Sequence, residues 1–156
     1  MRPLILAALM AALLPSVAWG PIYKPYRVAE LYPRAYVAVQ AKKYEVPTPI
    51  ALAVWEQEAS MRINPPDGAA GERGAFQMMR KAAMDAGCNR YWRDMRRFDL
   101  SVMCGLKYLS LSIKLCGSSI RGAHRYNNGT CPKRGKVWAY AQEISRLSIK
   151  HSQEWR

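Results

Sequence analysis

The chain has 156 residues, enough for one domain with a proper hydrophobic core. Its formal net charge is +13, and the basic residues are scattered apart from one local cluster, Arg90, Arg93, Arg96 and Arg97. Such a charge indicates an anionic partner: cell-wall glycan, an acidic membrane surface or extracellular nucleic acid. The sequence has no zinc-finger spacing and no aromatic RNA-binding strand, so we expect no nucleic-acid partner.

The first eighteen residues are typical of a secretory signal peptide. Met1 and Arg2 give a short positive start, Leu4 to Leu14 is an unbroken apolar run, and small residues precede a cut after Ala18. This run is too short to span a bilayer, which needs about 20 residues, and no cysteine follows it to carry a lipid anchor. A retained N-terminal anchor is the alternative. We therefore expect segment 1–18 to be removed and the protein to be exported, periplasmic or secreted, with no stable membrane span afterwards.

The mature sequence contains four cysteines, Cys88, Cys104, Cys116 and Cys131. An even number in an exported chain indicates disulfide bonds. Because no CxxC spacing occurs and only two histidines are present, we expect no metal site. A predicted helix over 102–116 would separate Cys104 from Cys116 by about 18 Å, whereas a disulfide tolerates about 7 Å between Cα atoms. Cys104 therefore pairs with Cys88 or with Cys131, and the sequence leaves both open.

The first part of the mature chain predicts two helices after an irregular start. Segment 19–32 is expected to be an extended arm, because it begins with a stretch rich in proline and aromatic residues. Residues 34–44 (RAYVAVQAKKY) predict a helix, and the break EVPTP follows. Thr48 is a suitable N-cap and Pro49 suits a first helical position, so a second helix should run from Pro49 to about Ser60.

The remainder predicts a loop and four further helices, with no β-alternation of useful length and no repeats. Residues 64–74, with two prolines and three glycines, are expected to form the loop. The helices are expected at 76–86 with Gly87 as a left-handed cap, at 100–116 with Asp99 as N-cap, at 119–126, and at about 137–148 before a polar tail, 151–156. The sequence thus predicts one compact all-α domain over residues 33–150.

The stretch WEQEASM (55–61) contains two glutamates near the end of the second predicted helix. On a helical wheel Glu58 shares a flank with Val54 and Trp55, whereas Glu56 points about 200° away. The two carboxyl groups therefore cannot act together on one bond. Glu58, beside the tryptophan, is the better candidate for a general acid, because burial raises a carboxyl pKa. Glu56 is interpreted as a charge on the outer face.

Two further segments contain residue types that suit a sugar ligand. GERGAFQMM (71–79) has two glycines that let a backbone approach an extended ligand, and its Gln77 amide can donate to and accept from sugar hydroxyls. HRYNNGT (124–130) places Tyr126 and Asn127 at a helix end, where an aromatic face beside an amide suits a sugar ring. Each segment alone also has an ordinary interpretation, as a loop turn or as a helix stop with a core tyrosine.

Taken together and in this order, five segments resemble the lytic transglycosylase and goose-type lysozyme family. KKYEVPTPIALAVWEQEAS resembles the family's YGVP-like turn and the helix that ends in its catalytic glutamate, and GERGAFQMM resembles its GxxGLMQ block. DLSVMCGLKYL resembles the N-I-x-x-G-x-x-Y-L helix, RYNNG resembles the AYNAG block, and Tyr140 in VWAYAQEI corresponds to a late tyrosine. The resemblance covers residues 33–147, nearly the whole mature chain.

This resemblance implies an all-α, lysozyme-like fold, and the four cysteines lead us to expect that disulfides stabilise it. It implies that Glu58, and not Glu56, is the catalytic acid and base. The residues that would line the glycan groove are Gln77, Tyr126 and Asn127, and Tyr140 would lie close to the glutamate.

Four positions depart from the family pattern. Ala59 stands where the family usually has serine, which would affect the rate or the placement of the substrate. Ala75 and Phe76 replace a Leu-Met pair and change the groove wall. Glu72 adds a carboxylate near the site. In goose-type enzymes extra acids accompany hydrolysis, although an exposed loop charge is the simpler interpretation of Glu72.

The implied reaction is cleavage of the β-1,4 bond between N-acetylmuramic acid and N-acetylglucosamine in peptidoglycan, with closure of a 1,6-anhydro ring and no cofactor. Peptidoglycan strands are the expected partner. The alternatives are a hydrolytic lysozyme of the same fold and a non-catalytic component of a wall-binding or secretion apparatus. The small size and basic charge favour local opening of the wall for a secretion, conjugation or phage machine.

Overall fold

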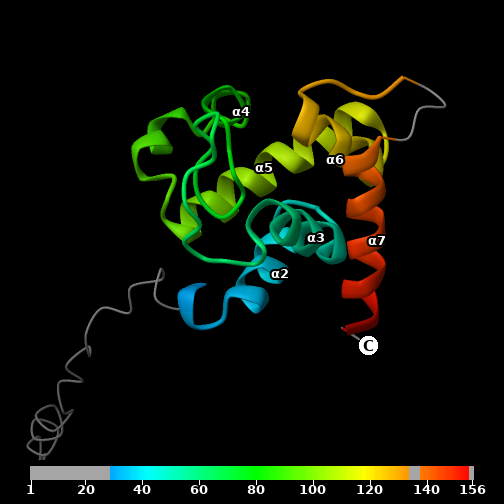
Figure 1. The fold of residues 1–156 in the computed structure, drawn as a ribbon, viewed down its shortest axis with the longest axis horizontal. Coiled ribbons are helices and arrows are strands. Elements are labelled where there is room, and N and C mark those ends of the chain that lie inside the picture. Colours follow the sequence, from blue (N-terminus) through cyan, green and yellow to red (C-terminus); the bar gives the residue numbers. More distant parts are fainter. Residues whose placement is uncertain (1–28, 134–137, 155–156) are drawn as a thin grey trace, which may run out of the picture.

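A computed structural model describes residues 29–133 and 138–154, which fold as an all-α domain (Figure 1). The predicted signal peptide and residues 19–28 of the predicted arm lie outside the described residues. Residues 29–31 are helical and Ala29 is buried, so this end of the segment is not the extended arm that we predicted. The helices are α2 (Pro33–Lys43), α3 (Thr48–Ala59), α4 (Arg80–Asp85), the 3₁₀ helix η1 (Asn89–Asp94), α5 (Phe98–Cys116), α6 (Ser119–Asn128) and α7 (Ala139–Glu154).

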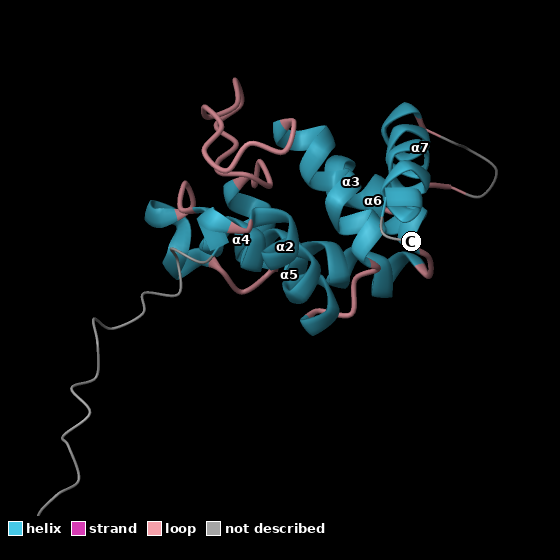
Figure 2. Cartoon of the chain, turned by 90° about the horizontal axis from the view of Figure 1, so that it is seen from below, coloured by secondary structure: helices cyan, strands magenta, loops and turns pink. Residues whose placement is uncertain are grey.

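Helix α3 lies in the middle of the fold between α2 and α7, while α5 packs against α2, α4 and α6 (Figures 1 and 2). Every residue of α3 from Ile50 to Trp55 is buried, and the Trp55 ring lies 5.3 Å from the Phe98 ring of α5, centroid to centroid. A helix that is apolar on all sides is a core helix. A polar side chain on α3 must therefore reach a neighbouring helix or a cavity.

No single helix in the described part of the chain is long and apolar enough to cross a membrane. Helices α5 and α6 have the length and apolar composition of a membrane span only when taken together, and they are bent by 118° at the break between them. Many of their apolar side chains, among them Leu106, Leu109 and Ala123, are buried in the core of the domain.

The segment before α4 differs from the sequence prediction. We predicted a helix from residue 76, but α4 begins at Arg80, and the preceding residues form a tight turn closed by two backbone hydrogen bonds between Arg73 and Met78. Gln77 adopts a left-handed backbone conformation with φ of 41°, which interrupts any helix at this point. The turn therefore replaces the first turn of the predicted helix and presents Gln77 beside α3.

Three other helix ends differ from the prediction. Helix α3 begins at Thr48, so Pro47 and not Thr48 occupies the N-cap position. Helix α5 begins at Phe98, which places Asp99 in the first turn instead of at the N-cap. Helix α7 continues to Glu154, so the predicted polar tail is helical that far. It continues because His151 is fully buried against the rest of the domain, a tertiary contact with no local sequence signal.

Two disulfides attach to α5, one at Cys104 in its first half and one at its last residue, Cys116. Cys88 bonds to Cys104 and Cys116 bonds to Cys131, with Cα–Cα distances of 6.0 and 5.5 Å. The exclusion of a Cys104–Cys116 bond is thereby confirmed, because both cysteines lie on one helix. The first disulfide ties the segment after α4 to α5, and the second ties the segment after α6 to the end of α5. Both therefore hold the helices that form the walls of the site described next.

Candidate active site

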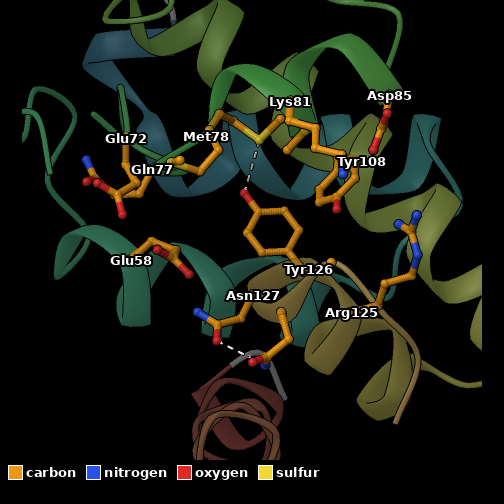
Figure 3. A pocket seen from close by; sticks show the side chains of 14 residues that line it. Glu58, Glu72, Gln77, Met78, Lys81, Asp85, Tyr108, Arg125, Tyr126 and Asn127 are labelled. Atoms are coloured by element: carbon orange, nitrogen blue, oxygen red, sulfur yellow. Dashed lines mark hydrogen bonds between the residues drawn. The ribbon is translucent and has the colours of Figure 1, made fainter. Parts of the chain in front are cut away.

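The side chain of Glu58 lines a groove of about 450 Å³ whose walls come from α3, α4, α5, α6 and the turn before α4 (Figure 3). The sequence-predicted residues Gln77, Tyr126 and Asn127 line the same groove. Tyr140 reaches Glu58 from α7. The fold thus brings together all five residues that the sequence singled out, from segments up to 82 positions apart.

Glu58 is held in the last turn of α3, where the chain changes direction sharply. Ser60 and Met61 both adopt left-handed backbone conformations, with φ of 49° and 60°. Trp55 fixes this end of the helix, because its Nε1 donates a hydrogen bond of 3.0 Å to the carbonyl oxygen of Arg62. The carboxyl group is therefore positioned by a rigid helix end and not by a loop, which favours a defined geometry.

Burial raises the pKa of Glu58 from its ordinary value of 4.5 to about 7. Removal of water disfavours the charged form, and the negative charge of Glu72 across the groove acts in the same direction, while the hydrogen bond from Tyr140 lowers the pKa. The carboxyl is therefore divided between its protonated and ionised forms near neutral pH. A group in this state can both give and accept a proton in one reaction cycle.

Tyr140 contributes the hydroxyl group that contacts Glu58. Its hydroxyl donates a hydrogen bond of 2.7 Å to Glu58 Oε1. Burial and the neighbouring Glu58 carboxyl raise the pKa of Tyr140 well above its ordinary value of 10. The hydroxyl therefore remains protonated and acts as a donor that stabilises the ionised form of Glu58.

Gln77 lies opposite Glu58 in the groove wall (Figure 3). Its side-chain Nε2 donates to the carbonyl oxygens of Gly74 at 2.9 Å and Pro66 at 3.2 Å. These bonds orient the amide and use its donors within the protein. Its oxygen is left as the atom able to accept a hydrogen bond from a ligand hydroxyl.

Tyr126 forms the floor of the groove with its ring and is otherwise a structural residue. Only 8% of its surface is exposed, and its hydroxyl donates a 2.6 Å hydrogen bond to the carbonyl oxygen of Phe76. The same hydroxyl lies 3.4 Å from the sulfur of Met78. Tyr126 thus holds the turn before α4 in place, and only its aromatic face is offered to a ligand.

Asn127 is exposed at the end of α6, where Gly129 ends the helix in a left-handed conformation with φ of 76°. Its Oδ1 accepts a 3.1 Å hydrogen bond from the side chain of Asn128, and both asparagines line the groove. The two amides therefore form a polar rim on the α6 side of Glu58, which suits hydroxyl and acetamido groups.

Glu72 is not a simple exposed loop charge. Its side chain lines the groove, with its carboxyl group facing Glu58 across it (Figure 3), and its Oε2 accepts a 3.0 Å hydrogen bond from the backbone N–H of Ala70. Within the described residues, no three His, Cys, Asp or Glu side chains gather closely enough to hold a metal ion. The carboxyl groups of Glu58 and Glu72 thus line one groove.

Glu56 is not the outward charge that we predicted. Its side chain is only 23% exposed and faces α7, where Oε1 lies 2.8 Å from Lys150 Nζ and Oε2 lies 2.8 Å from Nε2 of the buried His151. The prediction was wrong because α7, which supplies both partners, lies about 90 residues later in the chain. Glu56 does not line the groove.

Several groove residues were not predicted as site residues, among them Lys81 and Asp85 of α4, Tyr108 of α5 and Arg125 of α6. Lys81 and Asp85 are spaced by four positions and share a helix face, and Arg125 precedes the predicted Tyr126, so each had a local signal. Nothing in the sequence indicates that α4 and α6 face each other across one groove. The missing information is the tertiary arrangement.

Comparison with known proteins decides the family. The sequence profile described as "Transglycosylase SLT domain" matches residues 35–147, well over half of the chain. The chain belongs to the transglycosylase SLT domain family. No curated protein and no solved structure gave a significant match. Membership confirms the predicted resemblance and the lysozyme-like fold, and shows a lytic-transglycosylase-like domain that acts on peptidoglycan.

This SLT domain carries Ala59 directly after Glu58, at the position where we noted an expected serine. Ala59 is buried and has no polar side-chain atom, while the next residue, Ser60, is exposed in the left-handed turn that ends α3. The hydroxyl that contacts the carboxyl is that of Tyr140. In this SLT domain the orientation of Glu58 is therefore set from α7.

Proposed function

We propose that the protein is a peptidoglycan lytic transglycosylase that cleaves the β-1,4 bond between N-acetylmuramic acid and N-acetylglucosamine, with Glu58 as its acid and base. The observation that carries the proposal is a single buried carboxyl with a pKa of about 7 inside a groove of about 450 Å³ lined with amide and aromatic groups. Family membership supports a wall-glycan substrate.

The reaction begins with a proton transfer from Glu58. The protonated carboxyl donates to the glycosidic oxygen while the bond from this oxygen to C1 of the muramic acid breaks. The acetamido group of the same sugar supports the positive charge that develops at C1, as in the known exceptions to the two-carboxylate pattern. During this step Glu58 becomes ionised, and the 2.7 Å hydrogen bond from Tyr140 stabilises its negative charge.

The second step closes a ring within the sugar. Ionised Glu58 removes the proton from the 6-hydroxyl, whose oxygen then bonds to C1 and forms a 1,6-anhydro ring. The carboxyl regains its proton, no water is consumed, and neither a metal nor an organic cofactor takes part. Gln77 and Asn127 would hold sugar hydroxyl and acetamido groups, and the ring of Tyr126 would pack against a sugar face.

Hydrolysis by the same groove is a second candidate, and Glu72 is the observation that favours it. Its carboxyl group faces Glu58 across the groove, where it could accept a proton from a water molecule that attacks C1. The product would then carry a reducing end instead of an anhydro ring. Replacement of Glu72 by Gln should remove reducing-end products and leave anhydro products if both routes operate.

We further propose that the protein works outside the cytoplasm, after removal of segment 1–18, and that it opens the wall locally for a secretion, conjugation or phage machine. The wall-glycan substrate, the predicted signal peptide and the two disulfides support export.

Product analysis tests the proposed function. Purified peptidoglycan is digested with the mature protein, and the soluble products are analysed by mass spectrometry. We expect fragments that end in 1,6-anhydromuramic acid. Products with reducing ends only would establish the lysozyme reaction, and the absence of soluble products would establish a non-catalytic wall-binding role.

A further inference from the structure

The groove extends past Tyr126, away from Glu58, into a region with a different chemical character. Figure 3 shows Lys81, Asp85, Tyr108 and Arg125 on the far side of the Tyr126 ring from Glu58. Around Glu58 the other lining groups are amides, an aromatic ring and Glu72. The far end instead combines two cations with one carboxylate, so it suits a charged ligand more than a neutral sugar.

Arg125 is held in place at this end before any ligand arrives. Its guanidinium lies over the Tyr108 ring, 5.4 Å from the ring centroid, and its Nη1 donates a 3.0 Å hydrogen bond to Ser112 Oγ. Among the described residues no carboxylate forms an ion pair with Arg125, whereas Arg34, Arg96 and Arg146 each have one. A partly buried, oriented guanidinium without a carboxylate partner is suited to a carboxylate of a ligand.

Helix α4 supplies the opposite wall of this region. Lys81 and Asp85 are exposed, lie one helical turn apart and both line the groove. No ion pair involving Lys81 occurs among the described residues, so its ammonium group is available to a ligand. The region therefore presents two groups that bind carboxylates and one, Asp85, that binds an ammonium group.

The chemistry of the wall polymer offers a ligand with both kinds of charge. Each muramic acid of an uncleaved strand carries a short peptide stem, which contains free carboxylates and, at its diamino acid, a free amine. A stem-free muramic acid has a lactyl carboxylate and no amine. We propose that the Lys81–Asp85–Arg125 end of the groove binds the peptide stem of the substrate, so that the protein prefers stem-bearing glycan over stem-free glycan. This inference rests on the proposed function of the same groove.

In this arrangement the two cations bind a stem carboxylate, and Asp85 binds the amine of the diamino acid. Charge-assisted hydrogen bonds of this kind are stronger than neutral ones, so we expect stem-bearing glycan to bind about tenfold more tightly than stem-free glycan of the same length.

The experiment measures binding in a form that does not depend on turnover. Soluble glycan oligomers of one length, with and without stems, are titrated by calorimetry into the folded E58Q protein. Charge changes are then added to this variant: Lys81→Glu and Arg125→Gln at the site, and Lys42→Glu as a matched control on the exposed surface of α2. We expect either site change to reduce stem-bearing affinity to the stem-free level, with stem-free affinity unchanged, and the control to change neither.

The role assigned to Asp85 has its own variant. Asp85→Asn should weaken binding of stems that carry the free amine and should leave unchanged the binding of stems that end before the diamino acid. Equal affinities for stem-bearing and stem-free oligomers would overturn the inference, as would a stem preference that survives both Lys81→Glu and Arg125→Gln. Tighter binding of the stem-free oligomer would assign the cations to the lactyl carboxylate instead and also overturn it. Failure of the proposed function is seen separately, as absence of anhydromuramyl products from the wild-type protein.

Discussion

The two glutamates of α3 differ more in their partners than in their distance from the protein surface. Glu58 meets a hydroxyl group of α7, that of Tyr140, whereas Glu56 meets the ammonium of Lys150 and the imidazole of His151, also on α7. Neither carboxyl is freely exposed. We propose that the charge of the partner distinguishes Glu58, the proposed acid, from Glu56 in its ion pair. Among the described residues Glu58 pairs with no cation, and desolvation of such a carboxyl favours its protonated form.

The Glu56 side of α3 is a structural junction. His151 is fully buried between Glu56 of α3 and Glu154 of its own helix, and Arg34 of α2 forms an ion pair with Glu154. Three helices meet at this point. The same α3–α7 contact also holds Tyr140 against Glu58, so the structural junction and the proposed catalytic contact lie on the two sides of one helix pair.

The largest expected effect is that of Glu58→Gln. The amide cannot donate or accept the catalytic proton, so release of soluble glycan should fall by at least about 100-fold. The stability of the variant at neutral and higher pH should instead increase. Because the pKa of Glu58 in the folded state (about 7) lies above its ordinary value of 4.5, the wild type loses stability as pH rises through this interval. The variant should avoid up to roughly 3 kcal/mol of this cost.

Denaturant unfolding at pH 4 and pH 8 measures this stability change. We expect Glu58→Gln to unfold with a higher free energy than the wild type at pH 8, with the difference vanishing at pH 4. Retained glycan release in this variant would remove Glu58 from the mechanism.

Glu56→Gln is the matched control on the other side of α3. We expect it to lower the stability of the protein and to leave glycan release nearly unchanged. The substitution removes the negative charge beside Lys150 and the buried His151, so the free energy of unfolding should fall by about 1 to 3 kcal/mol. Glycan release at a temperature where the variant is folded should stay within a few-fold of wild type. Loss of release in a variant shown to be folded would contradict the division of roles between the two glutamates.

Tyr140→Phe tests the hydroxyl contact with Glu58. Without the 2.7 Å hydrogen bond the ionised form of Glu58 loses a stabilising donor, so its pKa should rise by about one unit. The weaker acid should release glycan about tenfold more slowly at pH 7, and the basic limb of the pH–rate profile should move to higher pH. An unchanged profile would mean that Tyr140 does not act on Glu58.

Much of the fold could be predicted because its signals are local. Thr48 and Pro49 predicted the start of α3 to within one residue, and the asparagines and glycine after Tyr126 predicted a helix stop close to the observed end of α6 at Asn128. Gln77 shows where this fails: the alanine-rich stretch after it favoured a helix from residue 76. Tertiary contacts, such as the 3.0 Å hydrogen bond from the Phe76 N–H to Ser101 Oγ, favour the turn instead.

The sequence predicted only those site residues that lie within the segments resembling the family. Glu58 and its neighbours on the resembling segments were named from the sequence, but Glu56 was placed on the outer face because its partners lie on α7. Lys81 and Arg125 were missed for the same reason, since they share a groove only after α4 and α6 have packed against α5. Charges that meet across helices have no period or spacing in the chain, so their pairing depends on the three-dimensional fold.

The measurement that tests the central claim most directly is a carboxyl titration followed by ¹³C NMR, with the Glu58 and Glu56 signals assigned from the two Gln variants. We expect the Glu58 carboxyl to titrate with a midpoint of about 7, because it is desolvated and forms no ion pair with a cation among the described residues. A Glu58 midpoint near its ordinary value of 4.5 would contradict the account, because the group would then be ionised at neutral pH and unable to act as the acid.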